Sequence, residues 1–372
     1  MSLPRSRIWF LTILLFGSST SVQAAGLKTQ NIFLIVSDGL RWQEVFTGVE
    51  EALLNKESGG VSDVQATRDK FWWPTPEARR QALLPFLWSE VAQEGQLFGN
   101  QNKGSVDTVT NGKNFSFPGY NEILTGAPDP KIYGNDKKPN RNVTVFEWLN
   151  GRPGFSRRVG VVGSWDAFPY IFNVARSHLP IWPTWEPDQR KYAIAAPRCL
   201  AELFQDTTPQ WGDVTYDSFM YQAASDYVKR SRPRVLFVGF GETDDWAHDG
   251  RYDQYLLSAH HVDDFIRRLW EQVQSMHQYR GKTTFIITAD HGRGSGPENW
   301  RRHGAGIAGA QDDWLAVIGP DTPPLGERSN CAPINHSQIA ATLAALLGED
   351  YRAAHAAVGP PVADLVRGGK SL

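Results

Sequence analysis

The chain has 372 residues, of which 41% are hydrophobic and 21% charged, and its formal net charge is −2. This length accommodates one large domain or two ordinary ones, and the composition is that of a folded globular protein. A balance so close to neutral argues against nucleic acid as an obligatory partner. It leaves a small anionic substrate open, because a metal site supplies its own local positive charge.

The first two dozen residues have the organisation of a secretory signal peptide. Two arginines precede an apolar run at 8–16, and small residues surround Ala24. A basic start, a short apolar stretch and small residues at the end are typical of a cleaved signal. The alternative is a membrane anchor, but this run is far shorter than the roughly 20 residues that span a bilayer. We therefore expect residues 1–24 to be removed, the mature chain to be periplasmic or secreted, and no later segment to cross a membrane.

Two cysteines, Cys199 and Cys331, lie in the predicted mature chain. Neither has the spacing of a metal-binding or redox motif. Export to an oxidising compartment favours a disulfide between them over two buried thiols.

Runs of apolar and β-branched residues predict buried strands, and longer runs with helical periodicity predict helices. In chain order, these elements are a strand at 31–36, a strand at 158–162, a helix at 215–228, a strand at 235–240, a helix at 254–274, strands at 283–288 and 314–318, and a helix at 337–347. Strands that alternate with helices predict an α/β fold, here a three-layer αβα sandwich with a mostly parallel central sheet.

The segment at about 41–99 fits neither pattern. It is long and aromatic, and we expect a cap-like insertion that covers either the sheet edge or the mouth of the active site. No repeat, low-complexity tract or charge block marks a second domain in residues 25–372, so we expect a single domain with this insertion.

Acidic and imidazole side chains follow three of the predicted strands. Asp38 follows the first strand, Asp244 and His248 follow the third, and Asp290 with His291 follows the fourth. In open α/β sheets, ligands bind beyond the carboxyl ends of the strands. A lone Asp after a strand is more often a turn or cap residue, so it is the joint occurrence that indicates a site. Carboxylates and imidazoles suit zinc, and a two-metal site clamps both oxygens of an in-line displacement.

The order of these residues resembles the alkaline phosphatase superfamily, and most closely its nucleotide pyrophosphatase/phosphodiesterase branch. The resemblance covers nearly the whole mature chain and includes Ser116 in the segment Phe-Ser-Phe-Pro-Gly and a His-Gly pair at His303. It implies two divalent metal ions of the zinc class. One would be held by Asp244, His248 and His303, and the other by Asp38, Asp290, His291 and the oxygen of Ser116.

The same resemblance implies that Ser116 is the nucleophile. In the phosphodiesterase branch this position is usually Thr in a Thr-Phe-Pro-Asn segment, whereas here the residue is Ser and the last place is Gly119. Serine also acts as nucleophile in the superfamily. The departure therefore makes the assignment to the phosphodiesterase branch less clear, but it leaves the expected chemistry the same. An Asn that helps to bind the phosphoryl oxygens is matched best by Asn135, with Asn114 in reserve.

A mechanism from general chemistry agrees with this resemblance. A serine hydroxyl is a weak nucleophile that metal coordination can activate. We therefore expect a metal-dependent hydrolase that acts on small anionic esters of the phosphate type through a covalent phospho-Ser116 intermediate. Asn135 and backbone amides near Ser116 would steady the non-bridging oxygens. The sequence slightly favours diesters or phosphonate-like substrates over monoesters.

Three alternatives stay open. Sulfatases of the superfamily have an Arg four residues after the position that becomes formylglycine, and this chain has Tyr120 there. A phosphoglycerate-mutase-like enzyme shares the metal pattern, although export argues against a glycolytic role. A catalytically inactive metal-binding relative is the third alternative.

Two further groups of residues near the motifs have open roles. His336 precedes a predicted helix, where capping or packing is favoured over metal ligation. Arg293, Arg301 and Arg302 flank the predicted ligands and either contact an anionic substrate or lie on the solvated surface.

Overall fold

The computed structural model describes residues 26–182, 185 and 194–365, so the predicted signal peptide lies outside the described residues. One central sheet has the strand order β10-β2-β9-β7-β1-β6-β4-β5. All neighbouring strands are parallel except β9, which runs antiparallel to β2 and β7. The strands are β1 (Asn31–Ser37), β2 (Gly95–Phe98), β4 (Val159–Gly163), β5 (Ile181–Trp182), β6 (Val235–Phe240), β7 (Thr283–Thr288), β9 (Leu315–Ile318) and β10 (Gly326–Glu327).

The predicted strands correspond to β1, β4, β6, β7 and β9, with ends that differ by at most one residue. Every residue of β1, β6 and β7 is buried. Their side chains alternate between two cores: Phe33 and Ile35 of β1 point into one, while Ile32 and Leu34 point into the other. Burial on both faces explains why these strands are continuous apolar runs in the sequence.

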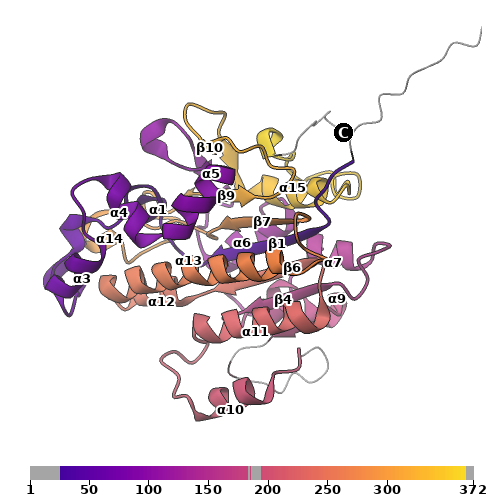
Figure 1. Ribbon diagram of the computed structural model, residues 1–372, viewed down its shortest axis with the longest axis horizontal. Coiled ribbons are helices and arrows are strands. Elements are labelled where there is room, and N and C mark those ends of the chain that lie inside the picture. Colours follow the sequence, from indigo (N-terminus) through magenta and orange to yellow (C-terminus); the bar gives the residue numbers. More distant parts are fainter. Residues whose placement is uncertain (1–25, 183–184, 186–193, 366–372) are drawn as a thin grey trace, which may run out of the picture.

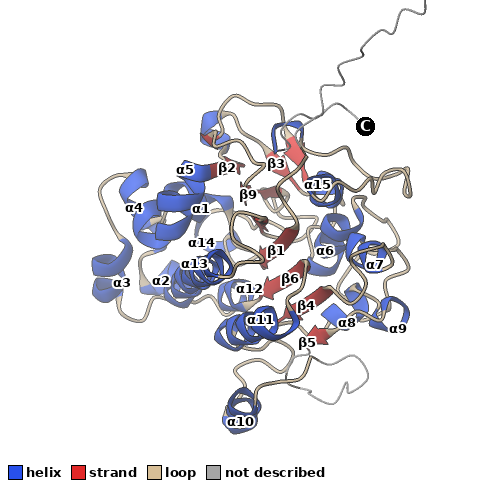
Figure 2. Cartoon of the chain, turned by 45° about the vertical axis from the view of Figure 1, so that its right-hand side comes forward, coloured by secondary structure: helices blue, strands red, loops and turns tan. Residues whose placement is uncertain are grey.

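Helices cover both faces of the sheet, as Figure 2 shows. On one side lie α11 (Asp217–Ser231) and α13 (Tyr252–Ser275), and on the other lie α6 (Ser116–Thr125), α7 (Val145–Asn150) and α15 (Ile339–Leu346). This arrangement confirms the predicted three-layer αβα fold with a mostly parallel sheet. Within the described residues, no helix is long and apolar enough to cross a membrane.

The segment at 41–99 consists mainly of short helices. These are α1 (Trp42–Thr47), η1 (Glu51–Leu53), α2 (Lys56–Gly59), α3 (Val64–Phe71), α4 (Pro76–Leu83), η2 (Leu87–Val91) and α5 (Ala92–Glu94). Helices α1, α3 and α4 lie at one end of the molecule in Figure 1, and α5 lies beside β10. The segment buries Val45, Phe46 and Leu53 in the core that α13 covers. The end of the segment is β2, so it returns into the central sheet.

A second, small sheet has the order β11-β3-β8. It is formed by β3 (Asp107–Thr108), β8 (Asp312–Asp313) and β11 (Ile334–Asn335), and β11 leads into the short helix η4 (His336–Gln338) before α15. The remaining helices are η3 (Gln101–Lys103), α8 (Phe168–Ile171), α9 (Val174–Ser177), α10 (Arg198–Asp206), α12 (Glu242–His248), α14 (Gly296–Asn299) and η5 (Ala363–Leu365).

The predicted disulfide is not formed. Cys199 lies exposed in α10, and Cys331 is half-buried with its thiol 3.4 Å from the Ser105 hydroxyl. Both cysteines are free, so the expectation of a pair is wrong for this structure. The two positions belong to different parts of the fold, which the spacing of cysteines in the sequence does not reveal.

Candidate active site

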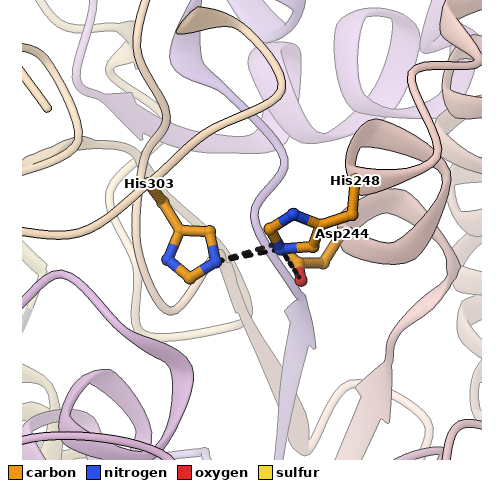
Figure 3. Close-up of side chains that lie close together, drawn as sticks. All are labelled: Asp244, His248 and His303. Carbon is orange, nitrogen blue, oxygen red and sulfur yellow. Dashed lines mark hydrogen bonds and ion pairs between the residues drawn. The ribbon is translucent and has the colours of Figure 1, made fainter.

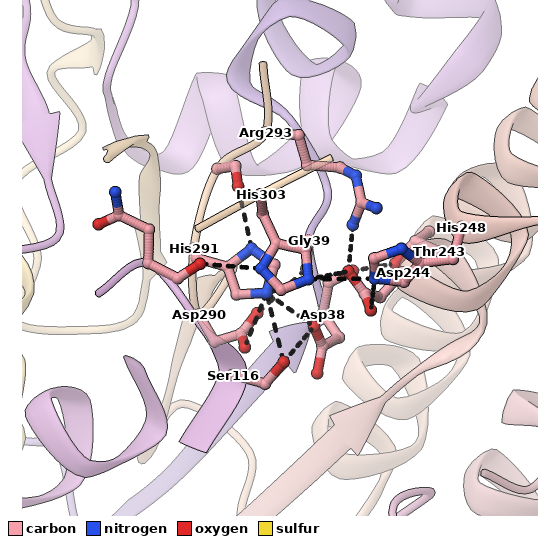
Figure 4. Close-up of polar contacts among 12 residues, drawn as sticks. Asp38, Gly39, Ser116, Thr243, Asp244, His248, Asp290, His291, Arg293 and His303 are labelled. Carbon is pink, nitrogen blue, oxygen red and sulfur yellow. Dashed lines mark hydrogen bonds and ion pairs between the residues drawn. The ribbon is translucent and has the colours of Figure 1, made fainter. Parts of the chain in front are cut away.

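Three adjacent strands bring the predicted acidic and imidazole residues together (Figure 4). Strand β1 lies between β6 and β7, and Asp38 follows it directly. Asp290 and His291 follow β7, while Asp244 lies in α12, the helix that comes after β6. Because these strands are parallel, their carboxyl ends meet at the same edge of the sheet. The side chains therefore converge although they are far apart in the sequence.

Ser116 also belongs to this cluster. It is the first residue of α6, the helix on the face of the sheet opposite α11 and α13. Its Oγ lies 3.5 Å from Asp38 Oδ1 and 3.3 Å from His291 Nε2. The residue is buried, and α6 ends at Thr125, followed by Gly126, whose positive φ of 73° suits the residue after a helix. Burial and a rigid helix fix the hydroxyl at the centre of the cluster.

A second group of donor atoms lies beside the first (Figure 3). His248 Nε2 is 3.1 Å from Asp244 Oδ2 and 3.0 Å from His303 Nε2. Asp244 also offers Oδ1, which lies 3.9 Å from His291 Nε2. Asp244, His248 and His303 form one set whose donor atoms could hold a metal ion, and Asp38, Asp244 and His291 form another. Asp244 therefore lies between the two groups and touches both.

Backbone carbonyls fix the tautomers of two of these imidazoles. His291 Nδ1 lies 2.9 Å from the carbonyl of Gly292, and His303 Nδ1 lies 2.8 Å from that of Asn114. An Nδ1–H that donates to a carbonyl leaves the Nε2 lone pair free for a metal. Burial lowers the pKa of His291 to about 4, and burial together with the neighbouring His291 lowers that of His303 to about 3. Both rings are consequently neutral at pH 7.

Negative charge is in excess around Asp38 and Asp290. Burial and the charges of Asp290 and Asp244 raise the pKa of Asp38 well above its usual range. Burial and the Asp244 charge raise the pKa of Asp290 to about 6. Asp290 Oδ1 accepts a hydrogen bond from the Gly39 amide, but its fully buried Oδ2 has no hydrogen-bond partner. Such an unpaired buried oxygen is costly unless a cation compensates it.

Arg293 is a residue of this site whose role the sequence left undecided. It is buried, and its guanidinium forms a close ion pair with Asp244 Oδ1. Burial acts to raise the pKa of Asp244, but Arg293, His248 and His303 more than offset it and hold that pKa well below its usual range. A position on the solvated surface is therefore wrong for Arg293. Arg302 is exposed at the end of the same loop, and Arg301 donates to the Ser58 carbonyl.

The two candidate Asn residues lie on either side of Ser116. Asn135 Oδ1 accepts a hydrogen bond from the backbone amide of Phe117 at 3.0 Å, so that amide is already occupied. Asn114 is buried with a positive φ of 52°, and its Oδ1 has no hydrogen-bond partner. Asn135 is thus tied to the residue that follows Ser116, whereas Asn114 is placed near Ser116 only by its position in the chain.

Gly119 explains one departure from the motif of the phosphodiesterase branch. A Cβ at this position would lie 2.1 Å from the carbonyl oxygen of Asp290. Helix α6 thus packs directly on the backbone that carries a candidate ligand, and any side chain here would separate the two. Glycine in place of the family's Asn allows this close approach.

The fold is that of the alkaline phosphatases. The chain superimposes on alkaline phosphatase PafA with a TM-score of 0.56 at 11% identity, covering 91% of this chain and 99% of PafA. The phosphonate monoester hydrolase SpPMH of Silicibacter pomeroyi gives a TM-score of 0.55 at 13% identity, with 90% and 76% covered. The phosphonate monoester hydrolase of Agrobacterium radiobacter gives a TM-score of 0.50 at 12% identity, and the match covers 86% of this chain and 74% of that enzyme. Identities this low establish a common fold and no more.

The family follows from the sequence itself. A model of the type I phosphodiesterase / nucleotide pyrophosphatase family matches residues 120–319, which is more than half of the chain. The chain therefore belongs to this family, as the order of motifs predicts. The match contains Asp244, His248, Asp290, His291 and His303 and begins shortly after Ser116. No curated protein matches the chain. Family membership supports a hydrolase of phosphoric esters.

Proposed function

We propose that this chain is a two-metal hydrolase of phosphate-type esters with Ser116 as its nucleophile. The observation that carries the proposal is the position of the Ser116 hydroxyl, 3.3 Å from His291 Nε2 and 3.5 Å from Asp38 Oδ1. Beside it lies a second set of donors around Asp244. A buried hydroxyl among metal-type ligands is what metal-assisted ester hydrolysis needs.

The donor atoms fit metal ions of the zinc class. His291 Nε2 lies 3.5 Å from Asp38 Oδ1 and 3.6 Å from Asp290 Oδ2. These distances are too long for hydrogen bonds. They match the separation of about 3.4 Å between ligand atoms around a tetrahedral ion with bonds of about 2.1 Å. The unpartnered Asp290 Oδ2 also needs a cation.

Two sets of residues would hold the ions. Asp38, Asp290, His291 and Ser116 would hold one ion, and Asp244, His248 and His303 the other. Arg293 would keep Asp244 ionised and oriented between the two sets. When bound, the two ions would favour the alkoxide of Ser116 and stabilise negative charge on the leaving oxygen.

In the proposed reaction, Ser116 Oγ forms a bond to phosphorus while the bond from phosphorus to the ester oxygen breaks. The alcohol leaves, and water then cleaves phospho-Ser116 to release the phosphoryl product. The first turn of α6 points its N-terminus towards this centre and favours negative charge there. The side-chain amide of Asn135 is held beside Ser116 by its hydrogen bond from Phe117, and it would donate to a non-bridging oxygen.

Tyr120 favours phosphorus over sulfur as the centre attacked. The sulfatase pattern has Arg at this position, whereas here the buried Tyr120 hydroxyl donates to Asp38 Oδ2 at 3.1 Å. Because Tyr120 fills the position and is bonded to a proposed metal ligand, a formylglycine at position 116 would lack the Arg of that pattern. This argues for an unmodified serine at position 116. The match at Asn135, without a recognisable monoester-binding Arg in the sequence, is what favours phosphodiesters or phosphonate esters as substrates.

We also propose a single-domain organisation and export for this chain. Residues 25–372 would form one hydrolase domain, with the helices of 41–99 as its insertion, exported after cleavage behind Ala24. The N-terminal sequence of the protein isolated from the periplasm or medium would test this. Material that begins at residue 1 would contradict it.

The function is tested with zinc-loaded protein and a panel of chromogenic phosphate monoesters, phosphate diesters, phosphonate esters and sulfate esters. Ser116→Ala should abolish turnover of every substrate while metal content stays near that of the wild type. The matched control is Ser164→Ala, because Ser164 is also buried and its hydroxyl has no hydrogen-bond partner. Wild-type turnover in Ser116→Ala would remove Ser116 from the mechanism. Two bound ions without hydrolysis of any ester would favour an inactive metal-binding relative.

A further inference from the structure

The carboxylate of Glu122 lies at the centre of a hydrogen-bond network beside the proposed catalytic residues. Glu122 belongs to α6, the helix that begins with Ser116, and it is 0% exposed. Its Oε1 accepts from the Thr110 hydroxyl at 2.6 Å, and its Oε2 accepts from the backbone amide and the side-chain amide of Asn111 at 2.9 and 3.0 Å. The backbone amide of Thr110 lies 3.0 Å from each oxygen. Four donor groups of one loop thus converge on a single side chain.

This network holds a tight turn at 110–114. Asn111 Oδ1 accepts from the backbone amides of Lys113 and Asn114 at 2.8 and 3.0 Å, while the Nδ2 of the same side chain donates to Glu122. Asn114 comes at the end of the turn with a positive φ of 52°. A residue other than glycine keeps this conformation only where its surroundings hold it. The peptide of Asn114 is therefore oriented by contacts that lead back to Glu122.

The turn holds the imidazole of His303 in place. The carbonyl of Asn114 accepts from His303 Nδ1 at 2.8 Å. The ring of Phe115, the next residue, packs edge-on against the imidazole with 5.4 Å between the ring centres. His303 belongs to no helix or strand, so the orientation of its ring depends on side contacts such as these. They leave its Nε2 facing His248.

We propose that Glu122 is a positioning residue that orients His303 for metal binding through the turn at 110–114. Glu122 fixes Asn111, Asn111 fixes the peptide of Asn114, and the Asn114 carbonyl keeps the proton of His303 on Nδ1. The lone pair of Nε2 is then free for an ion. Because α6 carries both Ser116 and Glu122, one helix sets the proposed nucleophile and orients a ligand beside it. This inference rests on the proposed function for the role of His303 as a ligand.

A purely structural Glu122 is the alternative, and the two roles differ in their consequences for the imidazole. Loss of a structural carboxylate would lower the stability of the fold and leave the His303 ring as it is. Loss of a positioning carboxylate would release the Asn114 carbonyl, so that the His303 proton could move to Nε2 and compete with a metal there. The tautomer of His303 therefore separates the two roles.

The test uses the full mature chain with Glu122→Gln, which keeps the size of the side chain but turns one acceptor oxygen into a donor that faces other donors. In the metal-free protein, NMR of the histidine ring nitrogens should show His303 protonated on Nδ1 in the wild type and as a mixture of tautomers in the variant. Competition with a zinc chelator should show an affinity about 10–100-fold weaker for one ion and unchanged for the other.

Two further variants complete the experiment. Glu147→Gln is the matched control, because Glu147 is a half-buried carboxylate of the neighbouring helix α7 that pairs with Arg176 and does not contact the turn. It should change neither the His303 tautomer nor the zinc affinities. Asn111→Ala covers the case in which Glu122→Gln fails to fold, since Asn111 is only half-buried. It should give the same two changes as Glu122→Gln.

An unchanged His303 tautomer, or unchanged zinc affinities, in both Glu122→Gln and Asn111→Ala would overturn the proposal and leave Glu122 a structural residue. A wild type in which His303 carries its proton on Nε2 would overturn it as well. A wild type that binds no zinc and hydrolyses no ester would instead contradict the proposed function. The tautomers of the metal-free proteins would still show whether Glu122 orients the His303 ring.

Discussion

The guanidinium of Arg293 forms a buried ion pair with the Asp244 carboxylate between the two groups of candidate ligands. Two hydrogen bonds orient the guanidinium of Arg293: Nε donates to the Trp300 carbonyl and Nη2 donates to the Arg301 carbonyl. A cation fixed so firmly next to a proposed ligand competes with a metal for the same oxygen. It also stabilises the metal-free site, because without Arg293 the Oδ1 of Asp244 would lose its cationic partner and only the contact of Oδ2 with His248 would remain.

Replacing Arg293 should therefore affect the metal-free and metal-loaded proteins differently. Removal of one partner from a buried pair costs about 3–5 kcal/mol, so Arg293→Gln should lower the stability of the metal-free protein by an amount of this order. Zinc would compensate Asp244, so the loss should be smaller in the loaded protein. Thermal denaturation with and without a chelator measures both values.

Arg301→Gln serves as the control, because Arg301 lies in the same loop but donates to the Ser58 carbonyl instead of a candidate ligand. Its effect should be the same with and without metal. A loss that is equal in both states for Arg293→Gln would show that Arg293 does not act through the charge of Asp244.

The contact between α6 and the turn after β7 should not tolerate even a methyl group. Alanine at Gly119 gains up to about 1 kcal/mol of helix propensity, but its Cβ would lie 2.1 Å from the Asp290 carbonyl oxygen. Overpacking of this kind costs about 1–3 kcal/mol or more and moves Ser116 away from His291. Gly119→Ala should thus lose stability and turnover, whereas Gly134→Ala, with nothing within 4 Å of its Cβ, should lose neither. Unchanged turnover in Gly119→Ala would show that catalysis does not need the close packing of α6 on the Asp290 carbonyl.

The central strands are predictable from sequence because they are buried on both faces. Each residue of β1, β6 and β7 is enclosed, so the apolar pattern is unbroken and the boundaries are clear. The same reasoning brings Asp38, Asp244 and Asp290 to one edge, since parallel strands share their carboxyl ends. Strands of two residues, such as β3 and β8, contain too little pattern to be recognised.

The parts that the sequence does not reveal depend on contacts between distant loops. The burial of Arg293 follows from an ion pair with a residue 49 positions away, and an arginine near a motif is otherwise most often exposed. A short helix begins at His336 as expected, but the capping box is formed by Asn335 and Gln338, so His336 does not cap the helix. Its imidazole instead points towards Asp107 and Asp313, and no spacing in the chain relates these three residues.

His303 should be the ligand whose removal empties one site and spares the other. Its Nε2 faces His248, and no strand positions it; its ring is instead held by the Asn114 carbonyl and the ring of Phe115. His303→Ala should lower metal content by one ion per chain and turnover by at least about 100-fold. His355→Ala is the control, since that ring packs on Tyr351 instead. An unchanged metal content in His303→Ala would exclude it as a ligand.

Asp263 should make the stability of the fold depend on pH. Burial is the largest cause that raises its pKa to about 7, although the amides of Phe86 and Leu87 donate to it. An acid whose pKa is higher in the folded chain stabilises it fully below the unfolded value, and this stability is lost as pH rises through the folded value. The wild type should thus lose up to about 4 kcal/mol between pH 4 and pH 7 relative to Asp263→Asn, at about 1.4 kcal/mol per pKa unit. Denaturant unfolding at each pH measures this difference, with Asp264→Asn as the neighbouring control. Parallel curves for wild type and Asp263→Asn would show that folding does not raise the pKa of this carboxyl, because its two amide donors offset its burial.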